Sequence, residues 1–439
     1  MKRFYAFFLV AFIGIVMIAG GPSTSLKAQE GFVPLFNGTN LDGWVNVNGA
    51  PETYTVKDGV IVCSGIPNGV LRTTKQYENY ILEMEYRHTK EGGNAGLFIH
   101  SNALPPVPGN PFTRSIEIQV MDGNGGDVFA IQGATMTPDK PHPRGGMRSY
   151  PAENRTNPSG QWNHYRVESR NGMISLAVNG EVVTRGYQAN PRKGYICLES
   201  EGSEIHFRNI RIRELPGSNP PPDVTATESQ GFRQLYNGND LREWKVSPGS
   251  EGHWTAKGHI LDYDGKSEAE DKDLWTREEF GNFVLIVDWR QTLEPEIDNV
   301  PIILPDGSYA VDEEGEQLRI PVMDAGDSGI YLRGSSKSQI NIWNWPIGSG
   351  EIWGYRLDES MPPSVRRGAT PILNADNRRL GQWNRFEITV IDDWVTVVLN
   401  GKTVIREAQL PGLPERGPIG LQNHGDPVQF ANIYIKELD

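Results

Sequence analysis

Glu117 and Gln119 lie two residues apart in the alternating run Ser115-Ile-Glu-Ile-Gln-Val120. Because side chains alternate along a strand, both point to the same face of a sheet. Asp122 follows where the run enters the glycine-rich segment 123–126, which predicts a position at the rim of the sheet. A carboxylate beside a carboxamide suits carbohydrate chemistry, since one group exchanges protons while the other fixes a hydroxyl. The alternative is a polar row on a solvent-facing sheet.

Two histidines offer further groups that titrate near neutrality. His100 ends the run 96–100 and could act as acid, base or metal ligand, although a hydrogen-bonded structural histidine is the simpler interpretation. His142 lies with Arg144 in a long segment rich in glycine, proline and arginine, residues 135–157. Loops of this kind often border binding clefts. We therefore predict His142 and Arg144 as substrate-binding residues.

The chain repeats itself, and the second copy carries different side chains at the candidate positions. Segment 31–44 matches segment 231–244 at half its positions. In the second copy the positions of Glu117, Gln119 and Asp122 are taken by amides, namely Gln339, Asn341 and Asn344. Amides do not exchange protons as carboxyls do. The comparison predicts proton transfer in the first copy.

Two more residues of the first copy are candidates by the same comparison. Glu199 follows the apolar run 196–198, where the second copy has Gln422, so the first copy is again the acidic one. Arg87 lies near the end of another alternating run, and its second-copy partner is Arg290. A structural ion pair would also explain the retained arginine. Both residues are predicted to line the substrate site.

The second copy has its own features that suit sugars. Tryptophans stack on sugar rings, and Trp343 and Trp345 flank the amide-bearing strand, where Gln339 and Asn341 could bind hydroxyls. Packing in the core is the competing explanation for at least one tryptophan. A distinct catalytic set is also open, drawn from the residues Glu351, His424, Asp324 and Asp327.

The pattern of the chain is that of two all-β domains. Short runs alternate between apolar and polar residues, and Asn179-Gly180 and Asn400-Gly401 are strong hairpin turns. Many such strands predict two tandem β-sandwiches or jelly rolls. We expect the domains to span 31–215 and 231–439, joined by a proline-rich linker at 216–230. An acidic insertion near 294–326 is predicted to form an extra hairpin.

Composition and the N-terminal segment indicate the kinds of partner and the cellular location of the protein. The 439 residues carry a formal charge of −13. This disfavours nucleic acid as a partner, because a protein that binds nucleic acid needs basic patches on its surface. Residues 1–28 have a basic start and a long apolar run, the features of a secretory signal peptide. We expect export to the periplasm, the cell surface or the medium, with no membrane contact after cleavage. Cys63 and Cys197 are expected to be small core residues.

The ordered motifs resemble one known family. Leu-Phe-Asn-Gly-x-x-Leu-x-x-Trp, Glu-Ile-Gln-Val-Met-Asp, Gly-Gln-Trp-Asn and Phe-Arg-Asn-Ile-Arg-Ile are similar to motifs of the 3-keto-disaccharide hydrolase domain family, formerly a domain of unknown function. The resemblance covers nearly all of 31–215 and 231–439. It implies a concanavalin-like jelly roll related to laminarinase-type glycosidases. It also implies activity on glycosides whose C3 hydroxyl has been oxidised to a ketone.

A C3 ketone acidifies the hydrogen on C2, so the leaving group at C1 can depart by elimination and water can add afterwards. This route needs a base, an acid and a group that stabilises an enolate. We expect Glu117, His100 and Asp122 to be catalytic, with an oligosaccharide or glycoside as substrate. No pattern requires a cofactor, and the acidic residues leave a divalent cation open. The alternatives are a lectin-like glycan-binding protein and a structural cell-surface module.

Overall fold

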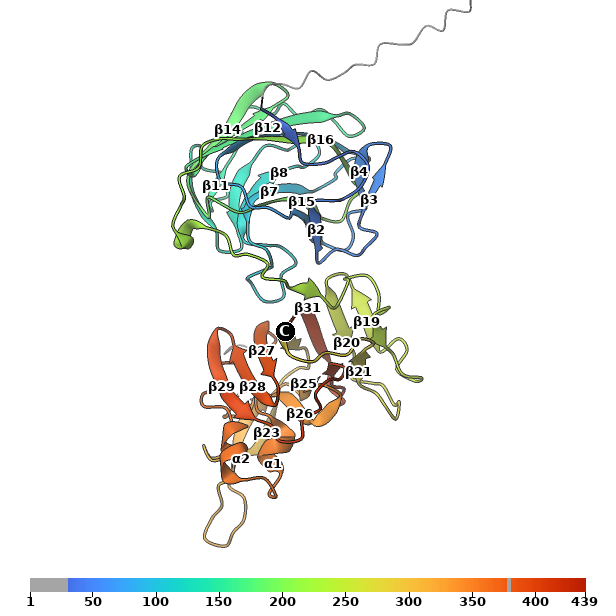
Figure 1. Ribbon diagram of the computed structural model, residues 1–439, viewed down its shortest axis with the longest axis vertical. Coiled ribbons are helices and arrows are strands. Elements are labelled where there is room, and N and C mark those ends of the chain that lie inside the picture. Colours follow the sequence, from blue (N-terminus) through green and yellow to red (C-terminus); the bar gives the residue numbers. More distant parts are fainter. Residues whose placement is uncertain (1–30, 377–379) are drawn as a thin grey trace, which may run out of the picture.

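The computed structural model describes residues 31–376 and 380–439, and the predicted signal peptide lies outside this range. Two β-sandwiches follow one another along the long axis of the molecule, with a narrow junction between them (Figure 1). Nearly every element is an antiparallel strand. The predicted all-β fold of two tandem jelly-roll-like sandwiches is therefore confirmed.

The first sandwich has two sheets, which we call its back and front sheets. The back sheet has the order β10 (Thr135–Pro138), β14 (Glu181–Asn190), β13 (Met173–Val178), β12 (Asn163–Arg170), β6 (Tyr80–His88), β16 (Ile205–Glu214), β4 (Val60–Cys63) and β3 (Tyr54–Lys57), with β1 (Val33–Pro34) on β16. The front sheet has the order β11 (Arg148–Ser149), β9 (Val128–Ile131), β8 (Ser115–Gln119), β7 (Gly96–Ser101), β15 (Tyr195–Ser200), β5 (Gly69–Thr73) and β2 (Trp44–Val47).

Alternation along the front sheet separates its core side from its outer side. Ile116 and Ile118 of β8 and Leu97 of β7 are fully buried between the two sheets. Each such side chain contributes roughly 1.5–3 kcal/mol through burial of apolar surface. Glu117 and Gln119 alternate with these isoleucines, so they share one face, as predicted, and this face is the outer side of the front sheet.

The second sandwich repeats this plan. Its back sheet has the order β19 (Trp254–Lys257), β20 (Ile260–Tyr263), β31 (Val428–Glu437), β22 (Phe283–Gln291), β27 (Asn384–Ile391), β28 (Trp394–Leu399) and β29 (Lys402–Gln409), with β17 (Arg233–Gln234) on β31. Its front sheet has the order β18 (Trp244–Lys245), β21 (Leu274–Thr276), β30 (Gly420–Leu421), β25 (Ser328–Leu332) and β26 (Ser335–Ile342).

Smaller elements complete the chain. The insertion forms a two-stranded ribbon of β23 (Glu296–Pro301) and β24 (Arg319–Asp324). This ribbon and two short helices, α1 (Trp353–Leu357) and α2 (Pro363–Gly368), lie in the part of the second sandwich that is distant from the first (Figure 1). The linker contains a 3-10 turn at Pro222–Val224.

Both predicted Asn-Gly turns are confirmed. Asn179 has a φ of 49° and Gly180 a φ of 99° between β13 and β14, and Asn400 and Gly401 have φ values of 50° and 78° between β28 and β29. Such left-handed backbone is accessible to asparagine and glycine with little strain. Cys63 and Cys197 are buried and free. Cys63 lies in the core of the first sandwich, as expected, whereas Cys197 lies in an apolar cluster that includes residues of the second sandwich.

The linker is docked rather than free. The backbone N–H of Ala226 donates to the carbonyl of Lys193 at 2.8 Å, and the Ala226 side chain is buried. The N–H of Thr227 donates to Oδ1 of Asn102 at 3.2 Å. These contacts hold the end of the linker against the first sandwich.

The two sandwiches meet front to back. Phe98 and Cys197, on the outer side of the first front sheet, share an apolar cluster with Ile286 and Tyr434 of the second back sheet. Asn48 lies at the edge of this cluster. Its amide donates to Oδ1 of Asn432 at 3.0 Å, and its Oδ1 accepts from the hydroxyl of Tyr434. The second sandwich therefore covers part of the face that carries Glu117.

Replacing Asn48 with alanine should destabilise the junction. The change leaves the buried hydroxyl of Tyr434 and the amide of Asn432 without this partner, and an unpaired buried polar group costs about 1–3 kcal/mol. Chemical denaturation of the full chain should show a lower unfolding midpoint. Asn124→Ala, at an exposed position, is the matched control. Equal midpoints for the two variants would contradict this role for Asn48.

Candidate active site

The centre of the candidate site is a pair of carboxyl groups that meet across a glycine. β7 lies between β8, which carries Glu117, and β15, which carries Glu199. A Cβ atom on Gly96 would lie 2.7 Å from Oε2 of Glu199 and 3.0 Å from Cγ of Glu117. Only glycine leaves room for both side chains to lie over β7. Glu117 and Glu199 are 6% and 1% exposed.

Burial and mutual repulsion change the acidity of this pair. Burial raises the pKa of Glu117 to about 8, and repulsion from Glu201 adds to this while Arg148 opposes it. Burial also raises the pKa of Glu199 strongly, with further contributions from Glu117 and Glu201. Two carboxyl groups that are this close together and this well shielded from solvent do not both ionise readily. The pair therefore holds protons at neutral pH, which suits a general acid.

Glu201 extends the pair into a cluster of three carboxyls. Its pKa is raised by burial, and a hydrogen bond from the amide of Asn94 opposes the increase. Unlike Glu117 and Glu199, Glu201 is only half-buried. Oε2 of Glu199 is buried and has no hydrogen-bond partner among the described residues. The cluster thus offers an unpaired buried oxygen beside a carboxyl that reaches solvent.

A polar network holds the cluster from one side. Gln119 donates through Nε2 to Oδ1 of Asn94 at 2.8 Å, and Asn94 donates to Glu201. Nη2 of Arg148, in β11, lies 3.5 Å from Oε1 of Gln119. Arg148 also forms an ion pair with Asp127. Gln119 is therefore joined to the cluster by hydrogen bonds, and its role in binding substrate stays a prediction. Sequence reasoning missed the contributions of Asn94, Asp127 and Arg148.

The predicted loop lies next to this network. Nε2 of His142 is 4.0 Å from Oδ2 of Asp127, and the backbone N–H of His142 donates to the carbonyl of Arg148 at 2.8 Å. Arg144 is exposed, and its N–H donates to Nδ1 of His142 at 3.1 Å. His142 thus borders the site, and Arg144 lies farther out on the same loop.

The structure does not bring His100 to Glu117. His100 has a φ of 54° at a bulge, which turns its ring into the interior, where Nε2 lies 3.0 Å from the hydroxyl of Ser169. Burial lowers its pKa to about 4. Arg333 occupies the equivalent position of the second sandwich with a φ of 50° and is also buried. Both side chains therefore make structural contacts in the interior of their own sandwich.

Two other candidates lie away from the carboxyl cluster. Asp122 accepts a hydrogen bond from the N–H of Gly92 at 3.0 Å, and it lines a small crevice with Tyr86 and His88, whose side chains belong to the interior. Arg87 lies on the outer side of the back sheet, where its guanidinium stacks on Trp162 at 4.7 Å. Arg87 therefore faces away from Glu117.

In the second sandwich, Gln339 occupies the place of Glu117. Its Nε2 donates to Oε1 of Gln422 at 2.8 Å and to Oδ1 of Asn341 at 2.9 Å. Asn341 is fully buried, and its amide lies 3.5 Å from Glu351, which is itself ion-paired with Arg356. Glu351 therefore has a structural partner, and Gln339 and Gln422 replace the acidic pair.

The two predicted tryptophans stack on each other. The rings of Trp343 and Trp345 are 3.7 Å apart and nearly parallel, and Trp343 is buried. Nε1 of Trp343 donates to the carbonyl of Gly348 at 3.3 Å. Trp343 is thus a packing residue, while Trp345 is only partly buried.

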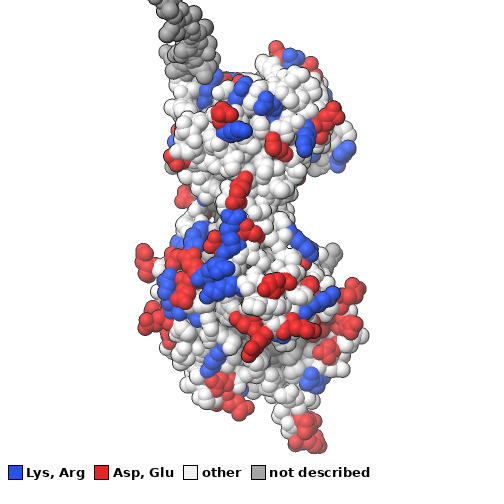
Figure 2. Space-filling model, turned by 90° about the vertical axis from the view of Figure 1, so that its right-hand side faces the viewer, with Lys and Arg blue, Asp and Glu red and all other residues white. Residues whose placement is uncertain are grey.

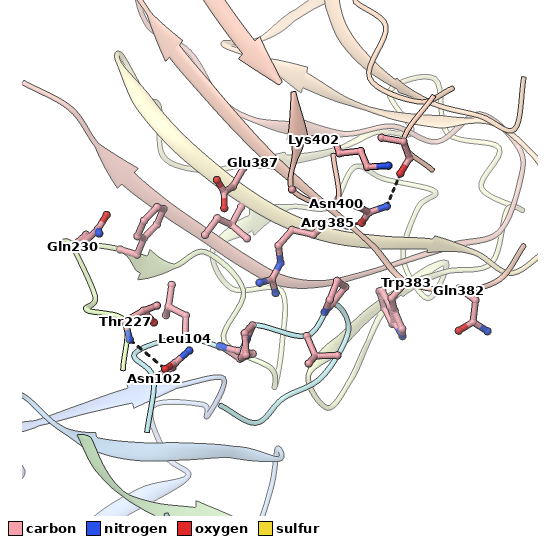
Figure 3. A pocket seen from close by; sticks show the side chains of 18 of the residues that line it. Asn102, Leu104, Thr227, Gln230, Gln382, Trp383, Arg385, Glu387, Asn400 and Lys402 are labelled. Atoms are coloured by element: carbon pink, nitrogen blue, oxygen red, sulfur yellow. Dashed lines mark hydrogen bonds between the residues drawn. The ribbon is translucent and has the colours of Figure 1, made fainter. Parts of the chain in front are cut away.

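Of the larger cavities elsewhere in the described part of the chain, two lie at the domain junction and on the front sheet of the second sandwich. One of about 950 Å³ lies at the domain junction, between the proline-rich segment 104–108 and Trp383, Arg385 and Lys402 of the second sandwich (Figure 3). Arg385 is held there by Asp288 through contacts of 2.6 and 2.8 Å. The other, of about 370 Å³, lies on the front sheet of the second sandwich and includes Gln339 and Gln422.

The described residues contain no group of three or more histidine, cysteine, aspartate or glutamate side chains arranged to hold a metal ion. None of the described helices is long and apolar enough to cross a membrane. Acidic and basic side chains are interspersed over both lobes of the face drawn in Figure 2, and no broad basic surface appears there.

Comparisons with known proteins agree with the sequence motifs. The profile of the family described as 3-keto-alpha-glucoside-1,2-lyase-like domain matches residues 31–213 and 231–436. A 3-keto-disaccharide hydrolase of Bacteroides thetaiotaomicron is 24% identical over 260 residues, which cover 45% of this chain and 87% of that protein.

Two solved structures are similar at low identity. A putative glycosyl hydrolase from Parabacteroides distasonis is 23% identical with a TM-score of 0.34, covering 43% of this chain and 95% of that one. A β-glucanase of Bacillus licheniformis is 14% identical with a TM-score of 0.28, covering 42% and 97%. Because the family profile matches both sandwiches, the chain belongs to the 3-keto-alpha-glucoside-1,2-lyase-like family and carries two copies of its domain.

Proposed function

We propose that this protein is an exported enzyme that cleaves glycosides oxidised at C3, with proton transfer in the first sandwich. The family and the Bacteroides relative support a carbohydrate substrate of this class. The basic and apolar start of the chain supports export. The observation that carries the proposed site is the pair Glu117 and Glu199, buried together across Gly96.

The proposed reaction starts with elimination. A base removes the proton from C2, and the C2–H electrons pass to the C3 carbonyl to give an enolate. The enolate then re-forms the C3=O bond, its electrons form the C1=C2 double bond, and the C1–O bond breaks. An acid gives its proton to the departing oxygen, which leaves as an alcohol or sugar. Water then adds at C1 while C2 regains a proton, so the net change is hydrolysis. The C3 oxygen carries the negative charge in the enolate that precedes C1–O cleavage and in the one that follows water addition, so it needs a hydrogen-bond donor.

The carboxyl cluster can supply these groups. Glu117 is protonated at neutral pH because burial raises its pKa to about 8, so it suits the acid. Burial also raises the pKa of Glu201, but this carboxyl is only half-buried and a hydrogen bond from Asn94 opposes the shift, so of the three carboxyls it is the best suited to act as the base. Glu199 is the second buried carboxyl and a donor for the ketone oxygen while it stays protonated. Glu199 takes the place predicted for His100, because His100 points into the core.

Glu117→Gln should reduce turnover strongly. The amide keeps the shape of the side chain but cannot give up a proton, and general acid catalysis contributes on the order of 10²–10⁴ in rate. Release of the aglycone from a chromogenic 3-keto glucoside measures the loss in kcat. Glu85→Gln, on the outer side of the back sheet, is the control. Turnover near that of the wild type would remove Glu117 from the reaction.

The pH dependence of turnover should follow the same carboxyl. Glu117 is an acid only while protonated, so kcat/KM should fall as pH rises through about 8. The falling limb should disappear in Glu117→Gln, whose remaining activity no longer depends on that proton. The profile is measured with the same substrate between pH 5 and about 10, with unfolding monitored in parallel. A falling limb that persists unchanged in the variant would assign the titration to another group.

A further inference from the structure

We propose that the second sandwich holds a separate binding site for one neutral sugar ring. The site is the cavity of about 370 Å³ on its front sheet, lined by β25, β26, the segment after β30 and the start of α1. A cavity of this size lies at the small end of ligand pockets, which suits a single ring with its substituent. The proposal concerns binding, and the catalytic cluster of the first sandwich takes no part in it.

The cavity occupies the same place in its sandwich as the carboxyl cluster does in the first. Gly329 of β25 stands where Gly96 stands in β7, and a Cβ atom on it would lie 2.6 Å from Cγ of Gln339. Gln339 and Gln422 take the positions of Glu117 and Glu199. The duplicated scaffold thus keeps the space above the glycine and lines it with amides in place of acids.

The polar lining can satisfy the hydroxyls of a sugar. The amides of Gln339 and Gln422 are joined by a hydrogen bond of 2.8 Å, and each amide has both donor and acceptor capacity. Asp327 also lines the cavity, and its Oδ1 is buried without a hydrogen-bond partner among the described residues. An unpaired buried oxygen is costly unless a ligand or water meets it.

The aromatic lining can contact the face of a ring. Trp353, the first residue of α1, is 41% exposed although it lines the cavity. Tyr331 of β25 also lines the cavity, and its ring is stacked on Trp275 at 5.4 Å. Sugar rings present C–H groups that pack on such flat aromatic surfaces. An exposed tryptophan beside paired amides is therefore well suited to a pyranose.

The charges around the cavity favour a neutral ligand. Burial raises the pKa of Asp327 to about 8, and repulsion from Asp426 and Asp324 adds to this. An anionic ligand would therefore approach acidic side chains. Lys337 lines the cavity but is paired with Asp358 at 2.5 Å. His424 lies with Nδ1 at 3.8 Å from Oδ2 of Asp327. Phosphorylated or acidic sugars are disfavoured by this arrangement.

Calorimetry on the full chain tests the proposal with trehalose and 3-keto-trehalose as probes; this choice of sugars rests on the proposed function. The parent is the Glu117→Gln and Glu199→Gln double variant, which keeps the oxidised probe from being consumed in the first sandwich. We expect a saturable heat with at least one probe, and a Kd weakened at least tenfold by Trp353→Ala or by Gln422→Ala. Trp394→Ala, an exposed tryptophan on the back sheet, should leave the Kd unchanged.

Three results would overturn the site. The first is that neither probe binds to the parent. The second is that Trp353→Ala and Gln422→Ala leave the Kd unchanged. The third is that heat is released or absorbed only with Ca²⁺ or Mn²⁺ and not with sugar. Circular dichroism of each variant checks that the fold is kept.

Turnover in the otherwise wild-type chain separates this proposal from the proposed function. Trp353→Ala should leave the release of a small chromogenic aglycone within about twofold of the wild type, since the reacting groups lie in the first sandwich. A loss of turnover on the scale expected for Glu117→Gln would make the cavity catalytic and contradict a separate binding site. Failure of the proposed function has a different signature, namely normal turnover in Glu117→Gln with probe binding intact.

Discussion

The proposed chemistry of the first sandwich depends on the exclusion of water from two carboxyl groups that share one space. Glu117 and Glu199 meet over Gly96, and a side chain at that glycine would occupy their place. Removing water from a carboxylate is expensive, so the pair retains protons at a pH where exposed glutamates are ionised. Everything proposed for the first sandwich follows from this, because an acid that is protonated at neutral pH is what the leaving group needs.

The remaining fold serves to keep this space dry and ordered. Ile116, Ile118 and Leu97 anchor the strands from the core side, so the alternating residues face outward in a fixed register. The second sandwich packs on Phe98, two residues along β7 from Gly96, and thereby covers the neighbouring part of the same face. The junction is thus part of the environment of the site, although the reacting groups come from one domain.

The sequence predicted the fold well because its signals are local. Alternation placed Glu117 and Gln119 on one face, and the Asn-Gly pairs marked two hairpins that the structure contains. Glu199 was recognised because the second copy has an amide there. The position of His100 was not accessible in this way, since a bulge with a positive φ reverses the direction that alternation would give. Asn94, Asp127 and Arg148 join the site only through pairing between distant strands, which no local pattern encodes.

The two sandwiches illustrate how one scaffold accepts different linings, with acids over Gly96 and amides over Gly329. The most direct test of the central claim is the titration of carboxyl groups by carbon-13 NMR in the full chain labelled at the glutamate side chains. The account predicts a carboxyl with an apparent pKa of about 8 that is lost in Glu117→Gln. Titration of every glutamate below about pH 5, as in exposed side chains, would contradict it.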